Sequence, residues 1–212
     1  MAAVAVVCGV TAGVLLRSDS EPKKESAGTE LVGLGPQGAE FGALLAKGKQ
    51  AVFHARYSAV SDDPEAAGQE LSMELWRKAP RERFDVTISA GGTTARSSGF
   101  RLPKDSVACT SEADGPWTCQ PAEAGAAGPD ALIAQVAAEM KGRTIVARDD
   151  RIGGSSVRCF TLPLDSYPGE VCVTRTGVPA RVSAGPSRIE LVELTTTVPD
   201  QVFSPPATPT KG

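Results

Sequence analysis

LSMELWRKAPRERFDVTI, residues 71–88, decides the fold of this chain. Its apolar residues occupy every second position in each half: Leu71, Met73 and Leu75, then Phe84, Val86 and Ile88. Such alternation is typical of strands that bury one face and expose the other. The segment between the halves is polar, and Pro80 removes a backbone donor where the ladder of hydrogen bonds would continue. The stretch therefore predicts an antiparallel hairpin with one apolar face.

Further elements are expected on both sides of this hairpin. A short amphipathic helix is predicted at 40–47, followed by a strand at 51–60 that contains Phe53 and Tyr57. The clearest helix pattern spans 129–140, where one apolar stripe is formed by Leu132, Ile133, Val136, Ala137 and Met140. Later strands are predicted at 144–148, 156–162, 170–175, 180–184 and 187–196. The predicted fold class is α+β: a curved antiparallel sheet, or half-barrel, with helices covering its concave face.

Length and charge narrow the classes of function. The chain has 212 residues, enough for one sizeable domain or two small ones. Its apolar fraction is 41%, and its charged fraction is 22%, both near the values of globular proteins. The formal net charge is -3, whereas nucleic-acid binding usually requires a basic face. Nucleic acid is therefore excluded as a partner.

Four of the five cysteines form two closely spaced pairs. Cys109 and Cys119 flank the polar loop TSEADGPWT, and Cys159 and Cys172 flank FTLPLDSYPGEV. Four cysteines permit three connectivities, and we favour local pairing because it closes two hairpin-like loops. Loops of this size contribute about 2–3 kcal/mol each. A zinc site is the alternative, but there is no C-x-x-C spacing and the single histidine lies far away. Disulfides imply an oxidising compartment.

The N-terminal segment agrees with that compartment. Residues 2–16 carry no charge and are followed by Arg17. The length of this uncharged run fits a signal-peptide core better than a membrane-spanning helix, which needs about 20 residues. Whether it is cleaved, retained as an anchor or lipidated at Cys8 stays open. Residues 1–17 are thus a signal or anchor segment and 18–38 a flexible linker. The expected location is extracytoplasmic, either anchored to the cell membrane or secreted.

The sequence contains no recognisable catalytic set. It has no G-x-S-x-G, no H-E-x-x-H, no phosphate-binding glycine loop and no EF-hand. His54 is the only histidine, and it is expected to face solvent on a strand without an evident carboxylate partner. The acidic pairs at 62–63 and 149–150 lie in turn-like contexts, where aspartate is common. We therefore expect a protein that is not an enzyme, with no catalytic residues, no cofactor and no metal.

The order of these features resembles a known family. An early helix and a Phe/Tyr strand precede a strand that ends in a Lys-x-Pro-x-x-Arg turn, made by Lys78, Pro80 and Arg83. The chain closes with a strand followed by Phe203, Pro205 and Pro206. This pattern resembles the LolA/LolB-type lipoprotein-carrier superfamily, including the LppX/LprG-type lipid-binding lipoproteins. The resemblance implies that residues 39–206 form a LolA-like half-barrel domain that holds acyl chains. The end of the chain is rich in Pro and Thr, and residues 207–212 are expected to form a disordered tail.

The sequence thus predicts an extracytoplasmic, non-enzymatic protein that binds a lipid or a lipidated partner in an apolar cavity. The alternative is an envelope sensor or protein-interaction domain of the same fold with no bound ligand. The expected partners are a lipid or acyl chain and, through the N-terminal segment, a membrane. The predicted lining of the cavity is Phe53, Tyr57, Leu71, Met73, Leu75, Phe84, Val86, Ile88, Leu132, Ile133, Val136 and Met140.

Overall fold

A computed structural model describes residues 35–61, 68–122, 143–163 and 168–210. The N-terminal segment and the predicted helix at 129–140 lie outside these ranges. Among the described residues, no helix is long and apolar enough to cross a membrane.

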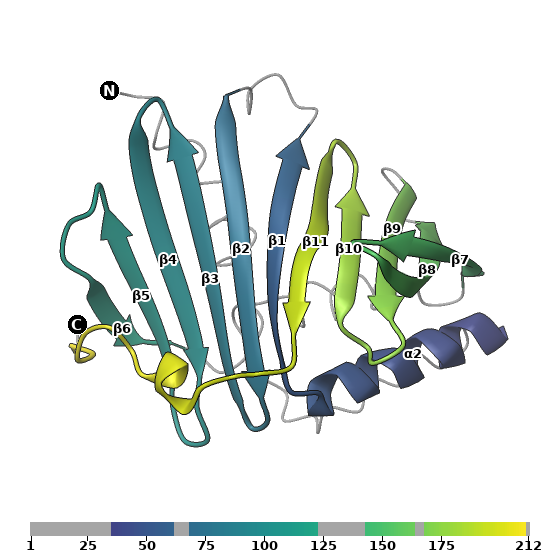
Figure 1. Cartoon of the computed structure of the whole chain (residues 1–212), viewed down its shortest axis with the longest axis horizontal. Helices are drawn as coiled ribbons and strands as arrows, with labels where there is room; N and C mark the ends of the chain where they lie inside the picture. Colours follow the sequence, from purple (N-terminus) through teal and green to yellow (C-terminus); the bar gives the residue numbers. More distant parts are fainter. Residues whose placement is uncertain (1–34, 62–67, 123–142, 164–167, 211–212) are drawn as a thin grey trace.

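Eleven strands form one antiparallel sheet in the order β6-β5-β4-β3-β2-β1-β11-β10-β9-β8-β7 (Figure 1). The first six are β1 (Phe53–Ser61), β2 (Gln69–Lys78), β3 (Arg81–Ala90), β4 (Thr93–Arg101), β5 (Ser106–Glu112) and β6 (Thr118–Pro121). The other five are β7 (Val146–Ile152), β8 (Ser155–Pro163), β9 (Pro168–Thr174), β10 (Pro179–Ala184) and β11 (Ser187–Thr195). Each group is a series of hairpins, and the β1–β11 pairing joins the two groups.

The predicted hairpin is confirmed as β2 and β3. Their register places Leu71 opposite Ile88, Met73 opposite Val86 and Leu75 opposite Phe84. On the other side of β2, Tyr57 of β1 lies opposite Met73. Because directly opposed residues share a face of a sheet, the predicted apolar face is present and continues into β1.

The one α-helix within the described residues, α2 (Gly35–Gln50), packs at the β8–β10 end of the sheet (Figure 1). Phe41 of this helix is buried, and its ring lies 4.8 Å from the ring of Phe160 in β8. The cluster around these rings also contains Ile145, Leu162, Val171 and Val173. The last turn of α2 carries Lys47 and Lys49, whose charges suit the negative end of the helix dipole.

Two glycines let the helix approach the β9–β10 turn closely. A Cβ atom on Gly48 would overlap the backbone of Gly177, and one on Gly177 would overlap the backbone of α2 at Leu44 and Gly48. Gly177 also has φ +83°, a conformation that side chains disfavour. Arg77 of β2 secures the same region, because its guanidinium donates a 3.1 Å hydrogen bond to the carbonyl of Gly48 and pairs with buried Glu82.

The predicted fold class, a half-barrel with helices covering its concave face, is wrong. The described residues form one open, eleven-stranded antiparallel sheet with one α-helix, and that helix does not cover a concave face. The large apolar side chains of α2 are those of Phe41, Leu44 and Leu45, and they pack in the cluster with β8 and β9. A short apolar stripe of this kind covers only one end of the sheet, so α2 does not cover the apolar face of β2 and β3.

Part of the core forms where the sheet packs on itself. Ile152 and Val157, near the tip of the β7–β8 hairpin, share a cluster with Tyr57 of β1, Leu75 of β2 and Leu191 of β11. The hairpin turn comes so close that a Cβ atom on Gly153 would lie 3.3 Å from the Leu191 carbonyl oxygen. The strongly curled β7–β8 end therefore supplies the second layer that a helix supplies in many sheets.

The C-terminal segment lies along the other end of the sheet. It includes a 3-10 helix, η2 (Asp200–Phe203), whose Asp200 pairs with Lys78 at 2.8 Å and Arg81 at 2.7 Å. Farther along, the amide of Thr210 donates a 3.0 Å hydrogen bond to the carbonyl of Cys119 in β6. Figure 1 shows this segment running from β11 past the ends of the central strands to β6.

Both predicted disulfides are present with the predicted local pairing. Cys109 joins Cys119 across β5 and β6, and Cys159 joins Cys172 across β8 and β9. In each case the two residues lie directly opposite in the ladder. Because such bonds persist in oxidising compartments, they point to an extracytoplasmic protein.

Candidate functional site

The predicted ligand-lining residues fall into two groups by burial. Phe53, Tyr57 and Leu75 are buried and belong to the core formed by the curled sheet. The half-buried group consists of Leu71, Met73, Phe84, Val86 and Ile88, which we call the β2–β3 apolar face. The remaining four, Leu132, Ile133, Val136 and Met140, lie outside the described residues. The shared face is confirmed, and its role in binding stays a prediction.

The β2–β3 apolar face has small neighbours on β4. The residues opposite Phe84, Val86 and Ile88 are Gly99, Ser97 and Ala95. Side chains of this size do not rise to cover the larger ones beside them. The β4 side chains therefore cover less of the apolar residues of β3 than larger side chains would.

Tyr57 places a polar group next to this face. Its side chain is buried, and its hydroxyl has no hydrogen-bond partner in the described part of the chain. Burial raises the pKa of Tyr57 well above its ordinary value, so the phenol is neutral and offers an O–H donor. A buried hydroxyl without a partner costs free energy, which a bound polar group would recover.

The opposite face of the same strands holds a stacked ladder of rings and a guanidinium. His54 stacks on Trp76 with centroids 4.6 Å apart and planes at 4°. Arg83 lies 4.8 Å from the Trp76 ring and 5.2 Å from that of Phe100, in contacts of the cation–π type. His54 also contacts Glu74 at 2.7 Å, so the expectation of a histidine without a carboxylate partner is wrong. The cross-strand register of β1 and β2 provides this partner.

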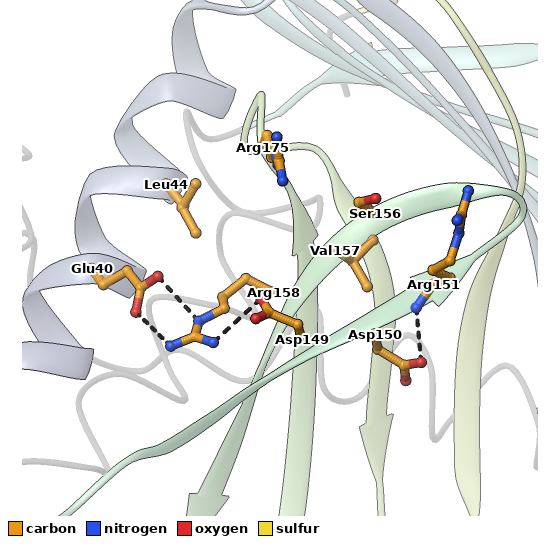
Figure 2. A pocket seen from close by; sticks show the side chains of 9 residues that line it. All are labelled: Glu40, Leu44, Asp149, Asp150, Arg151, Ser156, Val157, Arg158 and Arg175. Atoms are coloured by element: carbon orange, nitrogen blue, oxygen red, sulfur yellow. Dashed lines mark hydrogen bonds and ion pairs between the residues drawn. The ribbon is translucent and has the colours of Figure 1, made fainter.

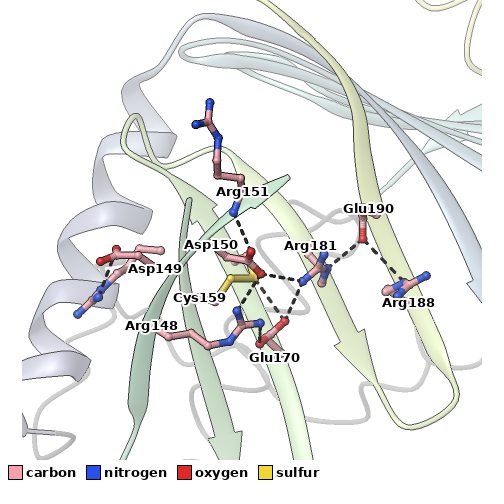
Figure 3. Close-up of a disulfide and its surroundings, with 11 residues drawn as sticks. Arg148, Asp149, Asp150, Arg151, Cys159, Glu170, Arg181, Arg188 and Glu190 are labelled. Carbon is pink, nitrogen blue, oxygen red and sulfur yellow. Dashed lines mark hydrogen bonds and ion pairs between the residues drawn. A yellow bond between two sulfur atoms is a disulfide. The ribbon is translucent and has the colours of Figure 1, made fainter. Parts of the chain in front are cut away.

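Around the second disulfide, charged residues on four strands form a network (Figure 3). Arg148 pairs with Asp150 at 2.8 Å and with Glu170 at 2.7 Å. Arg181 contacts the same two carboxylates and Glu190, the last at 2.9 Å. Hydrogen bonds from the Arg148 side chain and the Arg151 amide hold the pKa of Asp150 below its ordinary value. Asp149 and Asp150 lie within strand β7, so the expected turn-like context of this acidic pair is wrong, and Asp150 is an ion-pair partner.

One group of side chains in the described residues has the composition of a metal site. Cys159, Glu170 and Cys172 place their ligand-type atoms within 4.8 Å of one another. The two sulfur atoms are joined in a disulfide, however, and metal binding requires thiolates. The arrangement therefore offers no thiolate ligand while the disulfide is intact.

A hollow of about 750 Å³ lies between α2 and the β7–β8 hairpin (Figure 2). Its lining is mostly charged: Glu40, Leu44, Asp149, Asp150, Arg151, Ser156, Val157, Arg158 and Arg175. Arg158 bridges its two sides, because it pairs with Glu40 at 3.1 Å and with Asp149 at 3.3 Å. The sequence did not indicate this hollow, since its residues come from elements far apart in the chain.

No protein-family model and no curated protein matches this chain. Among solved structures, the chain is similar to MucB in the crystal structure of its complex with MucA(peri), with a TM-score of 0.42 and 13% sequence identity. The match covers 79% of this chain and 59% of the MucB chain. It is also similar to PNGF-II, with a TM-score of 0.37 and 10% identity over 76% of this chain and 32% of that chain. The chain thus spans less than two thirds of either protein. Likeness at this level carries no argument about function.

Proposed function

We propose that this protein is an extracytoplasmic, non-enzymatic binding protein whose β2–β3 apolar face holds the acyl chain of a lipid or of a lipidated partner. The observation that carries the proposal is that Leu71, Met73, Phe84, Val86 and Ile88 are only half-buried although they share one face of adjacent strands. Membrane attachment through residues 2–16 belongs to the same proposal.

The chemistry of this face suits an extended hydrocarbon. Covering apolar surface contributes about 0.8 kcal/mol for each buried CH₂ group. An acyl segment of about ten such groups would thus contribute up to about 8 kcal/mol before the cost of immobilising it. The neutral hydroxyl of Tyr57, opposite Met73, is a donor suited to an ester or amide carbonyl.

A paired substitution tests whether the face has room for a ligand. Val86→Phe enlarges a half-buried position on the β2–β3 apolar face, and Val192→Phe makes the same change at a residue that is 54% exposed. We expect the wild type to bind a fluorescent fatty-acyl probe, Val86→Phe to bind it at least tenfold more weakly with an unchanged melting temperature, and Val192→Phe to bind it normally.

The opposite result would identify the face as ordinary core. Overpacking a filled site costs about 1–3 kcal/mol. A Val86→Phe protein destabilised by that amount, together with a wild type that binds no probe, would refute the acyl-chain proposal.

A protein-interaction domain without a bound lipid is the second candidate. It is favoured by the hollow beside α2, whose lining includes six charged side chains. Native mass spectrometry of the protein purified from its own host separates the two candidates, because a lipid carrier is expected to retain lipid and an interaction domain is not.

A further inference from the structure

We propose that the hollow beside α2 binds an oxyanion, a carboxylate or a phosphate, carried on a small hydroxylated molecule. The hollow is distinct from the β2–β3 apolar face and shares no residue with it. A second hollow of about 340 Å³ adjoins it and shares Ser156 and Arg175 with it. The two together form a trough at the ends of the β7–β8 and β9–β10 hairpins, lined by charged, hydroxyl and apolar side chains.

The acidic residues of the trough already have cationic partners. Glu40 and Asp149 both pair with Arg158, as described above. Asp150 pairs with Arg148 and Arg181, which stand outside the lining. Each acidic residue of the trough therefore has a cationic partner, although Arg158 serves two carboxylates and Arg148 and Arg181 are shared with Glu170 and Glu190.

Two basic residues of the trough are not compensated in this way. Arg175 has no ion pair or hydrogen bond within the described residues, and the Arg151 side chain reaches only the carbonyl of Gly154, at 3.3 Å. In Figure 2, Ser156 lies between the two arginines, which come from different hairpins. Two guanidinium groups without carboxylate partners on one concave surface favour an anionic occupant.

Hydroxyl groups extend this site along the second hollow. Its lining includes Ser155, Ser156, Thr174 and Thr176, with Leu194 as an apolar member. The Thr174 and Thr176 hydroxyls bond each other at 2.9 Å, so the serine hydroxyls are the ones offered to a ligand. Hydroxyls both donate and accept hydrogen bonds, so they suit the hydroxyl groups of a ligand as well as its anionic oxygens. The apolar side chains of Leu44, Val157 and Leu194 offer contacts to a carbon skeleton.

The turn that carries Arg175 is held in one conformation. The Thr174 amide donates to the Val178 carbonyl at 2.9 Å, and the Val178 amide donates to the Thr174 hydroxyl at 3.0 Å. Gly177 of the same turn contacts the backbone of α2. A fixed turn positions its arginine before a ligand arrives, which lowers the entropic cost of binding.

The test uses the full chain with ¹⁵N-labelled arginine and three probes: inorganic phosphate, glucuronate and glucose. We expect both anions to shift the side-chain resonances of Arg151 and Arg175 saturably, and glucose not to shift them. If glucuronate binds more tightly than phosphate, the anionic group of the ligand is a carboxylate on a hydroxylated skeleton. If phosphate binds more tightly, the anionic group is a phosphate. Raising the salt concentration from about 0.02 M to about 0.2 M should weaken both interactions several-fold.

Matched variants locate the site. Arg175→Gln and Arg151→Gln should each weaken anion binding at least tenfold, whereas Arg188→Gln, at a 53% exposed arginine outside both hollows, should leave it unchanged. Thermal melts show that each variant folds. Anion binding that Val86→Phe leaves intact would separate this site from the acyl-chain proposal. Absent or non-saturable shifts in the wild type, equal binding by all three arginine variants, or binding of glucose as tight as glucuronate would overturn the proposal.

Discussion

Replacing Gly177 by alanine should release helix α2 from the sheet. The new Cβ atom would overlap the backbone of α2, and the residue keeps a φ of +83°. The left-handed conformation costs about 1–2 kcal/mol for a residue with a side chain. Overlap within a packed contact costs about 1–3 kcal/mol more, and reduced freedom of the unfolded chain returns about 0.4–1 kcal/mol. The expected net loss of stability is centred on about 3 kcal/mol, within a range of about 1–5 kcal/mol.

Gly92→Ala is the matched control. Gly92 has a φ of +78°, and nothing lies within 4 Å of the position its Cβ would take. Its substitution should therefore carry only the conformational cost, about 1 kcal/mol after the unfolded-state gain. The difference between the two variants isolates the contact between helix and turn.

Urea unfolding followed by tryptophan fluorescence measures both variants, because Trp76 and Trp117 lie in the sheet region and its loops. A melting experiment gives a second measure, with about 2–4 °C expected for each kcal/mol in a protein of this size. Equal losses for Gly177→Ala and Gly92→Ala would refute the reasoning, since they would mean that α2 moves away without cost.

Three other predictions concern packing, covalent links and charge. Phe41→Ala should lower the free energy of unfolding by about 3–5 kcal/mol, because the Phe41 ring is buried against Phe160. The control Val146→Ala, at a 62% exposed residue, should change the free energy of unfolding by less than about 0.5 kcal/mol in the same urea titration. Replacing Cys109 and Cys119 together by alanine should lower the free energy of unfolding by about 2–3 kcal/mol. Non-reducing peptide mapping of the wild type should recover the two local disulfides, and crossed pairs or free thiols would contradict the structure. Hydrogen bonds from Lys78 and Arg81 hold the pKa of Asp200 below its ordinary value, so the stabilisation from these ion pairs is present above the ordinary pKa and is lost as the pH falls through the lowered pKa. Asp200→Asn should remove that part of the acid sensitivity in unfolding curves measured between about pH 2 and pH 6. An unchanged pH profile would contradict the ion pairs.

The β2–β3 hairpin and the disulfides were predictable because their signals are local. Alternation in 71–88 specifies two strands and their shared face, and the ladder confirms it through pairs such as Met73 and Val86. The disulfides follow in the same way, because each pair of cysteines closes a hairpin whose strands are adjacent in the chain. Local patterns of this kind need no knowledge of tertiary structure.

The position of the helix and the partners of single residues were not predictable in the same way. The apolar stripe of α2 predicts which face of the helix is buried. It does not predict that Phe41 contacts Phe160, because that contact depends on the position of strand β8, which is distant in the sequence. His54 finds Glu74 through a register that the sequence does not specify by itself. The trough required Arg151 and Arg175 from two hairpins to line one hollow, and charged residues on a surface give no spacing signal for that.

The strand order has a consequence for how the chain folds. Apart from the β1–β11 ladder, all the pairings of the sheet join consecutive strands, so two hairpin series form from contacts close in sequence. The β1–β11 ladder alone brings together residues such as Tyr57 and Leu191, across a large loop whose closure costs entropy. We expect the two halves of the sheet to form early and their docking along β1 and β11 to limit the rate, as non-local contacts generally do. Substitutions in that one seam should therefore slow folding more than equally destabilising changes in any outer hairpin.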